Sequence, residues 1–130
     1  MTWQEAALGL AGVIGMGVAV IHGVLVQRLM VKPLNALSLA DDRMFPAVRR
    51  LTTPLLQFST FNWFIGGRAL IAAASGFEQD VRLATGLLVG SSYLFGAVCN
   101  LWATRRLHPG WILYTVALGL IAFGVSGAGA

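Results

Sequence analysis

Four long apolar stretches alternate with polar segments along the sequence, and each stretch is long enough to cross a lipid bilayer as a helix. A hydrocarbon core of about 30 Å needs about 20 apolar residues in helical conformation. The pattern therefore predicts an all-α polytopic membrane protein, with four transmembrane helices in an antiparallel bundle that forms one domain over residues 1–130. The predicted spans cover residues 6–30, 51–74, 83–104 and 109–127.

Small residues recur along one face of the first and third stretches. Membrane helices gain little from the hydrophobic effect when they associate, so they depend on close packing, which small residues permit. We therefore expect these two faces to lie inside the bundle. The face of the first stretch consists of Ala7, Ala11, Gly15, Ala19 and Gly23, and that of the third consists of Gly86, Gly90, Tyr93, Ala97, Asn100 and Thr104.

The second stretch carries polar residues on two nearly opposite faces. With about 100° of rotation per helical residue, Gln57 and Thr60 share one face and Asn62 lies across from them. A polar group that faces lipid without a hydrogen-bond partner is costly. We therefore predict that residues 51–74 form the central helix, with protein neighbours on both sides.

The segment 31–50 separates the first two stretches and has a proline near each end. Pro33 and Pro46 interrupt regular helix, whereas the mixture of apolar and basic residues suits a short helix that lies at the membrane surface. We predict such an interfacial helix on the cytoplasmic side, with an irregular loop as the alternative. Thr53 and Pro54 suit the cap and the first turn of the second span.

Positive charge is concentrated on one side of the predicted membrane. The chain is 57% hydrophobic and only 11% charged, with a net charge of +4. Because lysine and arginine are enriched in cytoplasmic loops, this side is predicted to be cytoplasmic, which leaves both termini outside, in a bacterial inner membrane. The position of these residues on the cytoplasmic side of the lipid bilayer then accounts for the net positive charge, and no nucleic-acid partner is predicted. The basic residues on this side are Arg28, Lys32, Arg43, Arg49, Arg50, Arg105 and Arg106.

Four polar side chains are predicted to lie in the cytoplasmic half of the bundle and to face its interior: His22, Gln57, Thr60 and Asn100. Two interpretations remain open. The cluster suits a ligand, proton or ion site, because ionisable groups inside membranes usually serve a function. It also suits hydrogen bonds between helices, each contributing about 1 kcal/mol. The absence of a carboxylate from all four predicted spans favours the second interpretation.

Three further residues are candidates for the same site or for contacts between helices: Asn62, Tyr93 and Arg68. Arg68 lies about two turns before the outer end of its span. We expect it to extend to that surface or to pair with Glu78 or Asp80.

The sequence offers little for catalysis. It has no pair of carboxylates within the predicted spans, a single cysteine, Cys99, and no metal-ligand spacing such as CxxC or HxxxH. Neither catalytic residues nor a metal site is therefore predicted. We expect a non-enzymatic assembly or accessory subunit that associates with itself or joins a larger membrane complex.

Two other functions remain open. One is a homo-oligomeric transporter or channel for a small solute, with its polar site in the cytoplasmic half. The other is a protein that binds a lipophilic cofactor such as haem, through His22 and its copy in a symmetric partner chain. A partner chain is needed because His108 is expected at the surface, at a different depth from His22.

Overall fold

The computed structural model describes residues 1–40, 43 and 45–127, and this part of the chain is all-α, in four continuous helical segments without strands. Helix α1 (Trp3–Val26) continues through the π-helical turn η1 (Gln27–Val31) into α2 (Lys32–Ala40), and α3 (Pro46–Ala74), α4 (Gln79–Thr104) and α5 (Pro109–Val125) follow. Two segments, Trp3–Ala40 and Gln79–Thr104, are long and apolar enough to cross a membrane, and α5 is a shorter apolar helix.

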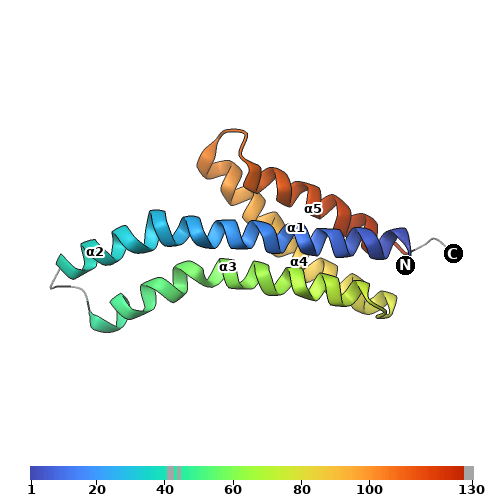
Figure 1. Cartoon of the computed structure of the whole chain (residues 1–130), viewed down its shortest axis with the longest axis horizontal. Coiled ribbons are helices and arrows are strands. Elements are labelled where there is room, and N and C mark those ends of the chain that lie inside the picture. The colour runs from blue at the N-terminus through green and yellow to red at the C-terminus, as the bar shows by residue number, and fades with distance from the viewer. Residues whose placement is uncertain (41–42, 44, 128–130) are drawn as a thin grey trace.

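Helix α1 is the central helix of the bundle. It packs against α3 and against α5 in the two most extensive contacts between helices, while α4 lies against α5 and, less extensively, against α3. Successive helical segments run antiparallel, so the start of α1 and the end of α5 lie at the same end of the bundle (Figure 1). The prediction that residues 51–74 form the central helix is therefore wrong, because the most extensive contacts belong to α1. The prediction of protein neighbours on both sides is confirmed, since α3 contacts α1 and, less extensively, α4.

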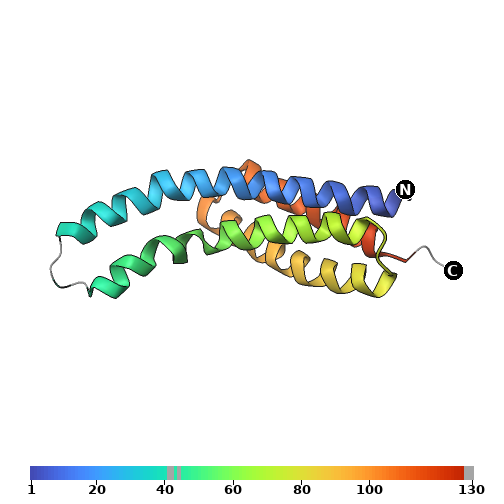
Figure 2. The ribbon, with the colours of Figure 1, turned by 60° about the horizontal axis from the view of Figure 1, so that its bottom comes forward.

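The α2 helix and the first turns of α3 extend beyond the loop that joins α4 to α5 (Figure 1 and Figure 2). The predicted short helix within 31–50 is present as α2, but it is not a separate helix: α2 continues α1, and α3 already begins at Pro46, with Pro54 inside it. Residues 41, 42 and 44 of that segment lie outside the described residues.

Pro33 fails to break the first helix because a wider turn precedes it. A proline inside a regular α-helix clashes with the carbonyl group four residues earlier, which here belongs to Leu29. The π-helical turn η1 spans that residue, and the Lys32 amide donates to the Gln27 carbonyl oxygen, five residues back. The extra residue in the turn gives the proline ring room and lets the helix continue.

The predicted small-residue faces pack inside the bundle. The closest approach of two backbones is between Gly12 and Gly67, where a Cβ added to Gly67 would lie 2.6 Å from the Gly12 carbonyl oxygen. Helices α1 and α3 are therefore in direct backbone contact. The buried members of the two predicted faces are Ala7, Ala11, Gly15 and Ala19 on α1, and Gly86, Gly90, Tyr93 and Ala97 on α4.

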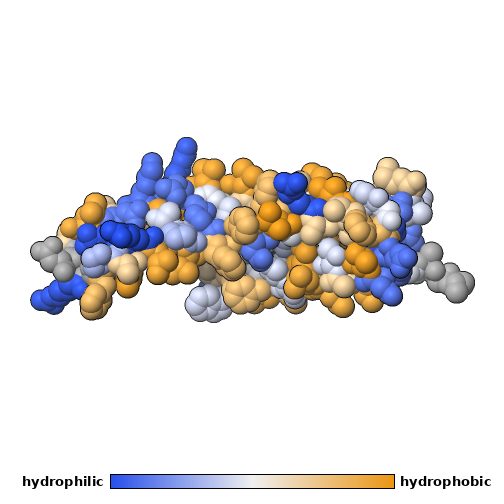
Figure 3. Space-filling view, turned by 90° about the horizontal axis from the view of Figure 1, so that it is seen from below, coloured by the Kyte–Doolittle hydropathy of each residue, from blue (hydrophilic) through white to orange (hydrophobic). Residues whose placement is uncertain are grey.

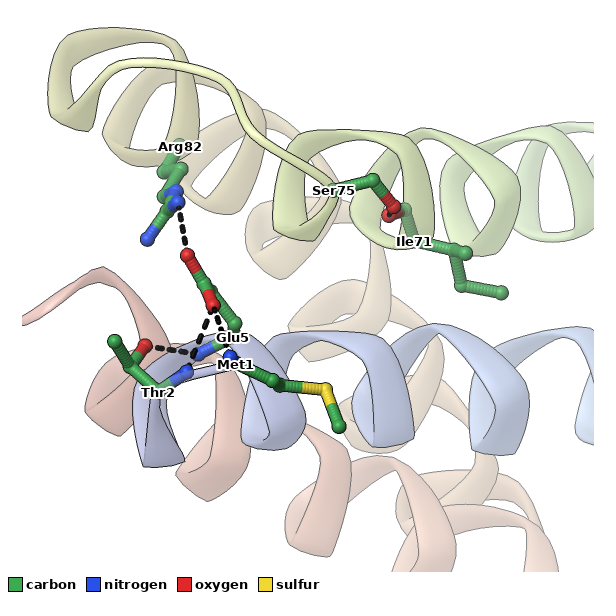
Figure 4. Close-up of polar contacts among 6 residues, drawn as sticks. All are labelled: Met1, Thr2, Glu5, Ile71, Ser75 and Arg82. Carbon is green, nitrogen blue, oxygen red and sulfur yellow. Dashed lines mark hydrogen bonds and ion pairs between the residues drawn. The ribbon is translucent and has the colours of Figure 1, made fainter.

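An ion pair joins the first turns of α1 and α4 (Figure 4). The Glu5 Oε1 atom lies 2.7 Å from Arg82 Nη2. Glu5 also accepts a hydrogen bond from the Thr2 amide, while the Thr2 hydroxyl accepts one from the Glu5 amide, which completes a capping box at the start of α1. The Thr2 amide and then the Arg82 guanidinium lower the pKa of Glu5 from its usual 4.5.

The outer surface of the bundle is rich in apolar side chains. In Figure 3, apolar residues cover much of the middle of the molecule, whereas hydrophilic residues gather toward its ends. Large apolar side chains from every helix are exposed, among them Leu10, Phe61, Leu88, Phe95 and Val116. A soluble monomer rarely exposes this much contiguous apolar surface.

Candidate functional site

The four polar residues predicted to form one cluster separate into two pairs. Gln57 and Thr60 lie where α3 crosses Gly23 of α1: the Gln57 amide donates to the Gly23 carbonyl oxygen at 3.1 Å and to Gln27 Oε1 at 3.3 Å. The Thr60 hydroxyl beside them is buried and has no hydrogen-bond partner in the described part of the chain. His22 and Asn100 instead line a cavity.

This cavity has a volume of about 260 Å³ and lies between α1 and the first turn of α5, with one residue each from α3 and α4. Toward their connecting loop, α4 and α5 diverge from α1 (Figure 1), and the cavity lies on that side of the bundle. Most of its surface is apolar. We call it the histidine cavity, and its principal lining residues are Ile21, His22, Leu25, Trp63, Asn100 and His108.

Neighbours on α3 hold the His22 ring in place. Its Nε2 atom lies 3.1 Å from the Ser59 hydroxyl oxygen, and its edge meets the Trp63 ring with a centroid separation of 4.6 Å. The tautomer sets which of His22 and Ser59 donates the hydrogen bond. In either tautomer, His22 Nδ1 has no hydrogen-bond partner among the described residues.

His108 lines the same cavity and also caps α5. Its Nδ1 atom accepts a hydrogen bond from the Gly110 amide at 3.1 Å, so the neutral ring carries its proton on Nε2. No described residue accepts from that Nε2–H group. His108 was expected at the surface, but it is half-buried and lines the same cavity as His22, because Arg105 ends α4 in a left-handed conformation and the short link after it leads the chain back to the cavity.

Asn100 supplies the third polar group of the cavity. One N–H of its side chain donates to the Gly96 carbonyl oxygen at 2.9 Å. The second N–H and the oxygen Oδ1 have no partner in the part of the chain that the structure describes. The cavity therefore combines apolar walls with a few unused hydrogen-bonding atoms, which is the usual composition of a small-molecule site.

Aromatic rings fill the interior behind the cavity. Trp63 meets Tyr114 edge to face at 5.0 Å, and Tyr114 stacks on Tyr93 at 4.8 Å. The Tyr93 hydroxyl donates to the Trp63 carbonyl oxygen at 3.3 Å. Tyr93, a candidate from the sequence, is thus a fully buried core residue that holds α4 against α3.

The other two candidates lie on the outer surface. Asn62 is exposed, and its side-chain amide donates to the Ser92 hydroxyl oxygen at 2.8 Å across the outer groove between α3 and α4. Asn62 therefore has a protein neighbour on its side of α3, as predicted, although its side chain stays exposed. Arg68 is also exposed, and it forms no ion pair with Glu78 or Asp80.

Sequence reasoning missed Ser59, Trp63 and His108 as members of the site. The signal for His108 was present, since Pro109 marks a helix start and the residue before it is the cap. Ser59 and Trp63 had no such signal, because their roles depend on how α3 is rotated against α1. Comparisons with models of protein families, with curated proteins and with solved structures found no match to this chain.

Proposed function

We propose that the chain is an integral protein of the bacterial inner membrane, with four spans and with both termini outside. The distribution of apolar residues supports this proposal. In each of the two long apolar segments, only 33% of the residues in the most apolar window are buried within the bundle. The remaining apolar side chains point outward, where lipid is the solvent that accommodates them.

Within that membrane, we propose that the protein is a non-enzymatic subunit of a larger assembly. The observation that carries this proposal is the exposed hydrogen bond between Asn62 and Ser92. Asn62 lies 12 residues before the end of α3 at Ala74, which places it about 18 Å along the helix from that end. At that depth, lipid cannot satisfy the remaining N–H and carbonyl oxygen of the amide, whereas a partner helix can.

The groove around this pair has the shape of a helix-docking surface. Its volume is about 420 Å³, and the small residues Gly66 and Ala69 lie in it between the larger side chains Ile65, Leu88 and Phe95. Small residues flanked by large ones let a neighbouring helix approach closely. The contact between α3 and α4 is also the least extensive of the four between neighbouring bundle helices. This groove on the outer surface is therefore open to a partner helix.

The test is whether the protein extracted in mild detergent runs alone or in a stoichiometric complex. We expect a complex, formed with a second copy or with another membrane subunit. The double variant Asn62→Leu, Ser92→Ala removes the polar pair, and we expect it to weaken the complex about three- to thirtyfold, the equivalent of one or two interhelical hydrogen bonds.

Asn35→Leu is the matched control, because Asn35 hydrogen-bonds to Thr53 away from the groove. A protein that stays monomeric in native membranes would contradict the proposed function. So would a complex that the double variant and the control weaken equally.

A further inference from the structure

We propose that the histidine cavity binds a neutral, membrane-soluble molecule whose head is a single flat ring with carbonyl oxygens and whose tail is a hydrocarbon chain, as in alkyl-substituted quinones. The proposal rests on the membrane location proposed above and is independent of the assembly role. Three features of the cavity support it: its volume, its unused hydrogen-bonding atoms and the position of its opening.

The volume of the histidine cavity limits the size of the ligand head that fits in it. A dry cavity of about 150 Å³ binds benzene, and drug-sized ligands occupy about 300–1,000 Å³. At about 260 Å³, the histidine cavity is large enough for one ring with substituents. A macrocycle of four pyrrole rings needs more room, so the geometry favours a single ring over haem.

The unused polar atoms of the cavity indicate which chemical groups the ligand head carries. His108 presents an Nε2–H group and Asn100 a second side-chain N–H, and neither has an acceptor among the described residues. Neither donor group is among the buried side-chain atoms that lack a partner, so both are accessible to a ligand. A carbonyl oxygen is the matching acceptor for an N–H group, so a ligand with carbonyl oxygens is favoured. The residues that line the cavity include no Lys, Arg, Asp or Glu. A charged head would therefore lack a counter-charge, and a neutral one is expected.

The position of the cavity opening indicates that the ligand has a hydrocarbon tail. Ile21 and Leu25 line the cavity and are 60% and 41% exposed, so the mouth lies on the apolar outer face of α1. In a bilayer this mouth faces hydrocarbon, so a tail that leaves the cavity stays in an apolar medium. The Trp63 indole provides a flat wall of the cavity. The His22 ring contacts this indole, and the Ser59 hydroxyl hydrogen-bonds to the His22 ring.

Trp63 also provides a direct readout. We propose to titrate the purified protein with decylubiquinone and to follow tryptophan fluorescence, in a background in which Trp3, Trp102 and Trp111 are replaced by phenylalanine. Saturable quenching is expected. Asn100→Leu and His108→Asn should each weaken binding about five- to tenfold, the usual effect of losing one hydrogen bond. Asparagine can also cap α5, so weaker binding by His108→Asn reports the loss of the Nε2–H donor and not a loss of folding.

Two comparisons make the result decisive. Decylbenzene has the same tail and a flat six-membered ring, but no carbonyl or methoxy oxygens, and we expect it to compete at least tenfold less well. Asn35→Leu, which lies outside the cavity, should bind as the parent protein does. Quenching that is linear in concentration, equal competition by decylbenzene, or unchanged binding in both cavity variants would overturn the proposal.

The outcomes also separate this proposal from the assembly role. The variant Asn62→Leu, Ser92→Ala should lower assembly and leave quenching unchanged, because neither residue lines the histidine cavity. Loss of quenching in that variant would show that the cavity forms only within the assembly. Ligand binding would then not be independent of assembly, which contradicts the proposal.

Discussion

The contact between Gly12 and Gly67 is a place where one added methyl group should be costly. A Cβ on Gly67 would lie 2.6 Å from the Gly12 carbonyl oxygen and 2.7 Å from Met16 Cγ, and the carbonyl belongs to the backbone and cannot rotate away. We expect Gly67→Ala to destabilise the protein by about 1–3 kcal/mol. Thermal unfolding in detergent, followed by circular dichroism, measures the change.

Gly17→Ala is the matched control for that substitution. Nothing lies within 4 Å of a Cβ at Gly17, and alanine is a better helix former than glycine by about 0.5–1 kcal/mol. This variant should therefore melt at or above the temperature of the parent protein. Equal melting of the two variants would mean that α1 and α3 do not approach each other at Gly12.

The contacts of Glu5 with the Thr2 amide and with Arg82 should make stability depend on pH. Glu5 precedes the predicted first span, and its pKa is lowered from 4.5 in the folded protein. A carboxyl group with a lowered folded pKa contributes stability that is present above its unfolded pKa and is lost as the pH falls through the folded value. The stability difference between the parent protein and Glu5→Gln should therefore shrink as the pH falls from 7 to below 4.5.

The substitution leaves the capping box in place, because glutamine serves at that position as well as glutamate. Melting temperatures of both proteins across this pH range measure the difference. Glu78→Gln removes a carboxylate that forms no ion pair in the described structure and is the matched control for the substitution. A constant difference at all pH values would show that the charge of Glu5 does not contribute to stability through the Thr2 amide or Arg82.

At the level of helices, the start of α5 depends on an unusual cap. The Nδ1 atom of His108 accepts the Gly110 amide, whereas serine, threonine, aspartate and asparagine are the common residues at this position. His108→Ala should destabilise the protein by about 0.5–2 kcal/mol, and His108→Asn should restore most of that loss. Hydrogen exchange at the Gly110 amide measures the cap directly. Equally fast exchange in the alanine and asparagine variants would contradict a capping role.

The sequence predicted the helices better than their ends. Apolar length and small-residue spacing located all four helical segments, because both depend on local composition. The error within 31–50 came from treating Pro33 as a helix breaker. A π-helical turn removes the clash that makes proline disruptive, and whether such a turn forms depends on the packing of the whole helix. That information is absent from the sequence pattern around the proline.

At the level of the whole molecule, the candidate site depends on how far the helices tilt and rotate. Helical periodicity placed His22 and Asn100 toward the interior, and both line the cavity. It could not show that Gln57 and Thr60 face a different seam, because that depends on the rotation of α3 against α1. Nor could it show that α4 and α5 diverge from α1 toward their loop, which opens the cavity and brings His108 to it.

The distribution of charge over the molecule predicts its orientation. Three of the five acidic residues, Glu5, Glu78 and Asp80, lie at the end that holds the N-terminus, where Glu5 pairs with Arg82. Seven of the nine basic residues lie in or beside the segments that connect the helices at the opposite end. Because basic residues are retained in the cytoplasm, the projecting α2–α3 end should lie inside the cell.

Single cysteines in a Cys99→Ser background test this orientation. Phe77 lies between α3 and α4 and Leu37 lies on α2, and both side chains are exposed. In intact cells, a membrane-impermeant maleimide should label Phe77→Cys and should reach Leu37→Cys only after the membrane is permeabilised. The reverse pattern would mean that the termini lie in the cytoplasm. Labelling of both positions in intact cells would mean that the two ends are not separated by a bilayer, and the proposed four-span arrangement would then be wrong.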